Sequence, residues 1–271
     1  MSSIRPPAVA GMFYPSGKIK LEDDIRLMLS NSATDYKIEN IFALIAPHAG
    51  YKYSGTTAAY AYNLIKDKDI NTVIILSPSH REYFPGISIY DGEAYETPLG
   101  IVPINKTVRE KLTSGSKLIF EGREGHKQEH AVEVQVPFLQ IVLKSFSIVP
   151  VVIGDQGKTY LYELSDKLKD VVDDKTIIVV STDLSHFYTK EEANELDSRV
   201  EQKVKLLDFE GLQRDLELNT CEACGGGGIV AAMKTADLMN KKNSLILNRS
   251  DSGDVTGDNS EVVGYLSAVI Y

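Results

Sequence analysis

Polar side chains that are able to do chemistry follow three separate apolar runs. IFALIA is followed by His48, VIILSP by His80, and TIIVVS by Asp183 and His186. Runs of this kind are typical of buried strands, and ligands bind at the carboxyl ends of strands in open α/β sheets. If the three strands are parallel neighbours, we expect their ends to form one site.

Asp183 and His186 lie three positions apart in DLSH, which places a carboxylate and an imidazole in one tight turn. The pair is suited to general acid/base chemistry, or to a carboxylate that orients a histidine. Asp and Ser are also good helix caps, so a structural role stays open. Further along, His126 and His130 have the i, i+4 spacing that places two residues on one helix face.

Cys221 and Cys224 form a C-x-x-C motif, followed by four glycines at 225–228. A cysteine at a helix start, with bare backbone amides after it, has its thiol pKa lowered, and the thiolate is the metal-binding form. The alternative is a buried structural cysteine beside glycines that allow close packing. No second cysteine pair follows at the spacing of a zinc ribbon.

Several common catalytic motifs are absent. G-x-S-x-G does not occur, the glycine run lacks the Lys and Ser/Thr of a P-loop, and no G-x-G-x-x-G follows a strand. Lys127 stands where H-E-x-x-H requires glutamate, so a metalloprotease is not indicated.

Apolar periodicity and the Gly/Pro pattern predict the elements that position these residues. An irregular but ordered arm is expected at 1–17, and a polar segment at 118–130. We predict strands at 41–46, 72–77, 87–92, 94–105 (strand-loop-strand), 146–155, 176–181, 243–250 and 262–271. We predict helices at 18–31, 56–67, 106–115, 131–143, 159–173, 190–209, 210–219 and 221–240. This alternation indicates one α/β domain, 1–271, with a mostly parallel or mixed sheet flanked by helices.

Composition limits the class of protein. The 271 residues carry a net charge of -9, which argues against a nucleic-acid partner. No apolar run approaches the ~20 residues that span a membrane, and two cysteines make no disulfide framework. We therefore expect a cytoplasmic protein. The site at the strand ends leads us to expect a small-molecule or peptide ligand.

Longer segments carry a resemblance to a known family. They are RPPAVAGMFYP, APHAGYKYSG, LSPSH, ETPLG, EHAVEVQVPFL, STDLSHF, CGGGGI and GDNSEVVGY, in this order from residue 5 to the C-terminus. Together they resemble the Memo family. The resemblance implies one α/β domain similar in fold to the class III extradiol non-haem iron dioxygenases.

The resemblance also implies a site. Its metal ligands are His48, His80 and Cys224, with Asp183 and His186 as an acid/base pair in the same pocket. His130 lies in a matching segment and is expected to line the pocket.

Two imidazoles and a thiolate suit Fe(II) or Cu, with Zn as a further option. Tyr51 and Tyr53 follow His48 closely and are expected to wall the pocket. The favoured hypothesis is a metal-binding protein with redox or oxygenase activity of the dioxygenase type. One alternative is a non-catalytic binding module of signalling type that retains the pocket. A weaker alternative is a hydrolase with Cys224 as nucleophile and His186 and Asp183 as its partners.

Overall fold

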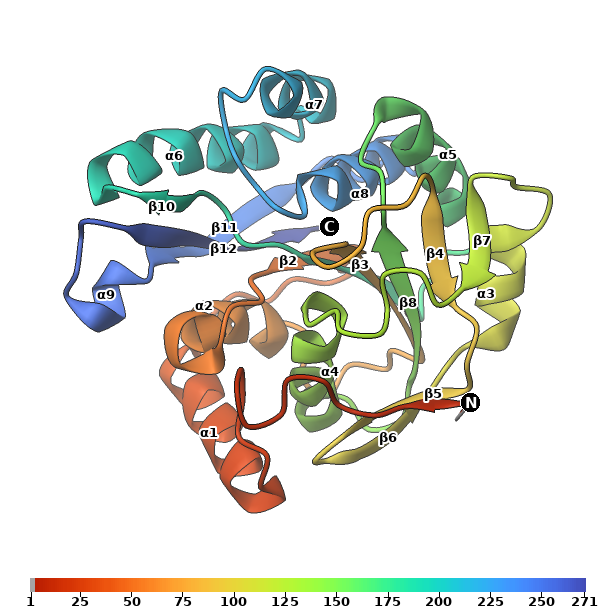
Figure 1. Ribbon diagram of the computed structural model, residues 1–271, viewed down its shortest axis with the longest axis horizontal. Helices are drawn as coiled ribbons and strands as arrows, with labels where there is room; N and C mark the ends of the chain where they lie inside the picture. The colour runs from red at the N-terminus through yellow and green to blue at the C-terminus, as the bar shows by residue number, and fades with distance from the viewer. Residues whose placement is uncertain (1–2) are drawn as a thin grey trace.

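The computed structural model describes residues 3–271, so the first two residues of the predicted N-terminal arm lie outside the described part. A large mixed sheet forms the centre, with strands in the order β10-β12-β2-β9-β3-β8-β4-β7 and with β11 paired to β12 (Figure 1). Its strands are β2 (Ala43–Ala46), β3 (Thr72–Pro78), β4 (Ile87–Tyr90), β7 (Ile119–Gly122), β8 (Ser147–Ile153), β9 (Thr176–Ser181), β10 (His186–Tyr188), β11 (Ser244–Asp251) and β12 (Val262–Ile270). The predicted mixed α/β fold is confirmed.

Helices cover both faces of this sheet (Figure 1). One face carries α1 (Lys18–Asn31), α2 (Tyr51–Asn63) and α4 (Ala131–Val142). The other carries α5 (Lys158–Lys169), α6 (Lys190–Leu206), α7 (Phe209–Glu217) and α8 (Gly226–Leu238), with α3 (Lys106–Thr113) beside β7. Successive strand residues point to opposite faces, so Leu44 joins one buried cluster and Ile45 the other. This double burial explains why the strands read as continuous apolar runs.

Four smaller elements complete the description. A second sheet joins β1 (Ile4–Arg5), β5 (Ala94–Thr97) and β6 (Gly100–Pro103), and α9 (Gly253–Thr256) precedes β12. No helix within residues 3–271 has the length and apolar character needed to cross a bilayer.

Most of the predicted elements are confirmed, with boundaries shifted by a few residues. The helix expected at 56–67 instead begins at Tyr51, because Gly50 is its N-cap and the loop after β2 is shorter than predicted. The polar segment 118–130 contains a strand, β7, that was missed.

The shared helix face predicted for His126 and His130 is wrong. Turns and irregular backbone precede α4, which begins at Ala131. His126 is buried elsewhere, where its ring bonds to the Tyr95 hydroxyl and the Ser88 carbonyl.

Candidate metal centre

The predicted convergence of strand ends is present. β9 lies between β2 and β3 and pairs in parallel with both, so the carboxyl ends of all three strands share one edge of the sheet. His48 follows β2, His80 follows β3, and Cys224 precedes α8. One potential ligand atom from each of these three residues lies within 4.8 Å of the other two. We call these three residues the His/His/Cys group.

The hydrogen bonds around His48 fix the tautomer of its ring. The Ser181 hydroxyl lies 2.7 Å from the Ala131 carbonyl, which only accepts, so the hydroxyl proton is donated there. Ser181 Oγ must then accept from His48 Nδ1, 2.9 Å away, as it accepts from Gln135. Since Nδ1 carries the proton, His48 Nε2 is a free lone pair, and it lies 3.2 Å from Cys224 Sγ. Burial lowers the pKa of His48 to about 3, so the ring is neutral near pH 7.

His80 is held in the same way by a carboxylate. Glu129 Oε1 lies 2.8 Å from His80 Nδ1, and Glu129 Oε2 accepts the His80 backbone N–H at 2.7 Å. Hydrogen bonds from His80 outweigh the burial of Glu129 and hold the pKa of that carboxyl at about 2, so it is ionised. His80 Nδ1 is therefore the donor, and Nε2 is the ring nitrogen that remains for another partner. A carboxylate behind a histidine is the usual outer partner of a metal ligand.

Cys224 lies at the start of α8, as predicted, but the expected effect on its pKa is wrong. Burial and the nearby Asp183 carboxylate raise the pKa of the thiol. They outweigh the donors around Sγ, among them the Asp183 backbone N–H at 3.2 Å. A bound cation would supply a favourable charge, since metal coordination deprotonates a thiol. The raised pKa disfavours Cys224 as a free nucleophile.

Asp183 and His186 both line a cavity of about 410 Å³ beside the group, which we call the metal-side cavity. Asp183 Oδ1 accepts the backbone N–H groups of His48 and Ala49, at 2.8 and 3.3 Å. The carboxylate therefore fixes the loop that carries His48. His186 begins β10, which pairs with β12.

His130 lines the same cavity and lies close to both histidines of the His/His/Cys group. Its ring centroid is 4.6 Å from that of His80, nearly parallel to it, and 5.2 Å from that of His48. Burial lowers the pKa of His130 to about 4, which makes this ring neutral near pH 7 as well.

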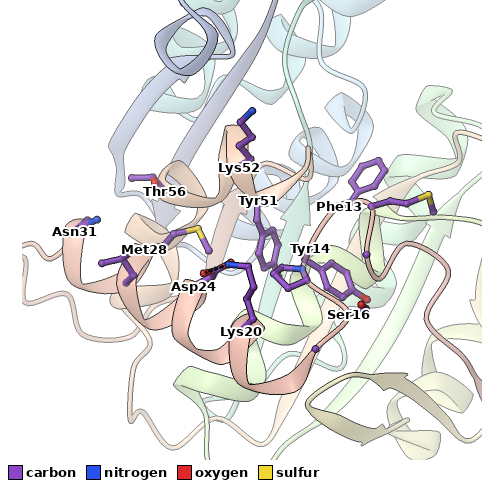
Figure 2. A pocket seen from close by; sticks show the side chains of 15 residues that line it. Phe13, Tyr14, Ser16, Lys20, Asp24, Met28, Asn31, Tyr51, Lys52 and Thr56 are labelled. Atoms are coloured by element: carbon purple, nitrogen blue, oxygen red, sulfur yellow. Dashed lines mark hydrogen bonds and ion pairs between the residues drawn. The ribbon is translucent and has the colours of Figure 1, made fainter.

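The two tyrosines predicted to wall the pocket line different cavities. Tyr53 lines the metal-side cavity, whereas the Tyr51 hydroxyl donates to the Val134 carbonyl and its ring does not line that cavity. Tyr51 instead borders a groove of about 770 Å³ between the N-terminal arm, α1 and α2. Figure 2 shows its ring in this groove, near Tyr14.

The residues that orient the two histidines were not predicted from the sequence. Glu129, Ser181 and Gln135 act on His48 or His80 from segments that are close in space. Asp197 of α6 accepts the Ser185 backbone N–H inside DLSH. Of these residues, only Glu129 could have been suspected from the sequence, because it stands next to His130. Ser181 reads as the last residue of a strand, and Asp197 as one carboxylate of a charged helix.

Substituting Glu129 with glutamine tests the orientation of His80. Gln has one acceptor oxygen and cannot hold both the ring and the backbone N–H. Loss of such an outer partner typically costs 10–100-fold in metal affinity, so we expect Fe(II) affinity to fall by roughly that factor. Anaerobic calorimetric titration measures it, with the exposed Glu124→Gln on the same segment as control. Equal affinities in the two variants would contradict the role of Glu129.

The raised pKa of Asp197 predicts that the stability of the fold depends on pH. Burial raises its pKa to about 6, so the folded chain holds a proton that the unfolded chain releases near pH 4. Stability from this group is present below about pH 4 and is lost as pH rises through about 6. We expect Asp197→Asn to raise the free energy of unfolding by about 1–3 kcal/mol near pH 8, and by less near pH 4. Denaturant unfolding at both pH values measures this, and a gain independent of pH would oppose it.

The donor set fits a metal ion. One nitrogen from each of two imidazoles and one sulfur lie within 4.8 Å of one another, and each histidine is oriented through its other nitrogen. Imidazole and thiolate together suit soft or borderline ions. His80, Glu129 and His130 form a second possible group. There, however, the Glu129 oxygens already accept N–H groups from His80 and Ala131.

Fold and site thus define an α/β protein with a candidate two-histidine, one-cysteine metal centre at the carboxyl edge of its sheet. Residues 5–269 match the family described as Memo-like protein, and the chain belongs to the Memo family. It is 38% identical to the MEMO1 family protein TV1383 of Thermoplasma volcanium, over 98% of each chain. It is also 38% identical to a MEMO1 family protein of Sulfurisphaera tokodaii, over 97% of this chain and 98% of that one.

A solved structure shares the fold. It is the crystal structure of the uncharacterized protein JW3007 from Escherichia coli K12, with a TM-score of 0.58 and 14% identity. The similarity covers 85% of this chain and all of that one. At this identity the likeness concerns the architecture alone.

Proposed function

We propose that this protein is a non-haem, metal-dependent oxidoreductase of the dioxygenase type, acting on a small molecule bound in the metal-side cavity. The observation that carries the proposal is the geometry of the His/His/Cys group. Both histidines are held through Nδ1 by a fixed acceptor, and the Cys224 sulfur lies 3.2 Å both from His48 Nε2 and from the backbone nitrogen of the cavity residue Asp183. Such preorganisation exceeds what packing alone requires.

The donor set also guides the choice of metal. A thiolate with two imidazoles favours Fe(II) or Cu over hard ions such as Mg²⁺, with Zn as a further option. When bound, the metal would supply a Lewis acid and, for Fe or Cu, a redox centre. Two free cysteines, one of them a ligand, agree with a reducing cytoplasmic location.

The chain's own residues have separate tasks in this proposal. His48, His80 and Cys224 bind the metal. Asp183 holds the His48 loop through two backbone N–H groups. His186, which lines the cavity, accepts or returns the proton of a substrate hydroxyl.

A combined metal and oxygen experiment tests the proposal. The protein is purified without oxygen, its metal content is measured, and the metal-free form is titrated with Fe(II), Cu(I) and Zn(II). We expect about one ion per chain, and stabilisation against unfolding by about 3 kcal/mol at a hundredfold excess over Kd. Oxygen uptake with catechols should then be metal-dependent and lost in His186→Ala. Absence of tight binding for all three ions would overturn the proposal.

The departure from known iron oxygenases favours a second candidate, a non-catalytic binding module. Those enzymes use two histidines and a carboxylate, whereas Cys224 supplies an oxidisable thiolate here. In this reading the cavity binds a small molecule or peptide without turnover. Tight metal and ligand binding without any oxygen uptake would select it.

A further inference from the structure

The metal-side cavity has aromatic walls contributed by four separate parts of the chain. Phe13 comes from the N-terminal arm, Tyr53 from α2, Phe187 from β10 and Tyr265 from β12. A volume of about 410 Å³ is at the small end of the range for ligand pockets. Aromatic faces favour flat rings by stacking, and they attract cations through their negative faces.

Phe187 has an unusual conformation for a residue with a large side chain. Its φ is +64°, in the left-handed region, and 72% of the residue is exposed. A register shift between His186 and Tyr188 interrupts the pairing with β12 at this point. Bulges often re-aim a side chain next to a site, and strained backbone concentrates at functional positions. The bulge therefore presents an aromatic ring at the cavity.

The cavity lining contains acidic side chains and two histidines, His130 and His186. Within residues 3–271, this lining includes the carboxylates of Asp183 and Glu261 and neither lysine nor arginine. In the described part of the chain, the Glu261 carboxylate has no hydrogen bond or ion pair. A carboxylate or phosphate ligand would find neither lysine nor arginine in this lining, whereas a cation would find the Glu261 carboxylate.

Two lysines lie near the lining without supplying that partner. Lys52 lies over the Tyr53 ring, with Nζ 5.4 Å from its centroid, and borders the groove between the arm, α1 and α2 (Figure 2). Lys190 is engaged by Asp251 and Asp254, at 3.0 and 2.6 Å.

We propose that the metal-side cavity takes a small aromatic molecule that carries a protonated amine, with its ring among Phe13, Tyr53, Phe187 and Tyr265 and its ammonium group toward Glu261. The inference rests on the proposed function, because it names the substrate class of that same site. It adds a discrimination by charge: aromatic cations are preferred over neutral analogues, and aromatic carboxylates are excluded.

A matched series of phenols tests the charge preference apart from the metal. Tyramine, p-cresol and 4-hydroxyphenylacetate share the ring and differ in charge, and none of them is a catechol that chelates metal. Calorimetric titration of the metal-free protein should give tyramine about fivefold to tenfold tighter binding than p-cresol, and the carboxylate the weakest binding. Equal affinities, a preference for the carboxylate, or no binding of any compound would overturn the proposal.

Two substitutions test the acidic part and the aromatic part of the cavity independently. Glu261→Gln should remove the preference for tyramine over p-cresol while p-cresol binds as before, and Glu39→Gln, an exposed site with the same charge change, should preserve the preference. Phe187→Ala should weaken both compounds by a similar factor. Retained preference in Glu261→Gln would show that this carboxylate does not receive the amine and would overturn its assignment.

A repeat with the metal-loaded protein and the catechols dopamine, 4-methylcatechol and 3,4-dihydroxyphenylacetate tests the two proposals separately. Failure to bind metal would overturn the proposed function and leave the charge order of the phenols as measured. Metal binding with equal affinities for the three catechols would overturn only the charge preference.

Discussion

Replacing Cys224 with serine is expected to lower the affinity for Fe(II), Cu(I) and Zn(II) by about 100-fold or more. The loss of an outer partner alone costs 10–100-fold, and this substitution removes a direct ligand. Cu(I) should be affected most, since it has the strongest preference for sulfur. The Cys224 sulfur lies 3.2 Å from His48 Nε2, so it belongs to the same donor set. Anaerobic titration of metal-free wild type and variant measures the difference.

The chain supplies its own control for this result in Cys221. This second cysteine is buried, its pKa is raised by burial to about 11, and it is not part of the His/His/Cys group. Cys221→Ala should therefore bind metal as tightly as the wild type. A similar loss in both variants would point to a general loosening of the turn before α8, and the ligand assignment would then fail.

The large-scale fold could be predicted because its strands are buried on both faces. β2, β3 and β9 are continuous apolar runs, and the residues after them are abruptly polar. β7 and β10 were missed because they are short, lie toward the ends of the sheet and include exposed residues. Tertiary pairing rather than local pattern makes them strands.

The candidate metal ligands were expected from the family resemblance, and the two histidines also from the strand ends, but the residues that orient them were not. His48 depends on Ser181 and Gln135, which are 133 and 87 positions away along the chain, and His80 depends on Glu129, 49 positions away. A hydrogen bond across such a separation leaves no periodic signal in the sequence. The raised pKa of Cys224 could not be predicted either, because the burial of this thiol depends on the packing of all the elements around Cys224.

The N-terminal arm shows a further long-range contact that only the structure discloses. Glu133 of α4 is fully buried, and both of its oxygens are occupied. Oε2 accepts from Arg5 Nη1 and the Ala8 backbone N–H, each at 2.7 Å, and Oε1 accepts from the Val9 N–H and the Tyr14 hydroxyl, at 3.0 and 2.6 Å. One carboxylate thus fastens the arm to the core beside Phe13, whose ring lies 4.6 Å from that of His130.

Substituting Glu133 with glutamine is expected to lower the free energy of unfolding by about 3–5 kcal/mol. The substitution leaves Arg5 as an uncompensated buried charge and turns one acceptor into an amide donor that faces other donors. Tyr14→Phe removes a single hydrogen bond and should cost only about 1 kcal/mol. Denaturant unfolding measures both losses, and limited proteolysis should cut the arm of the glutamine variant first. Equal small losses in the two variants would mean that the ion pair does not hold the arm. Because the arm places Phe13 against His130, detachment should also weaken p-cresol binding in the metal-side cavity.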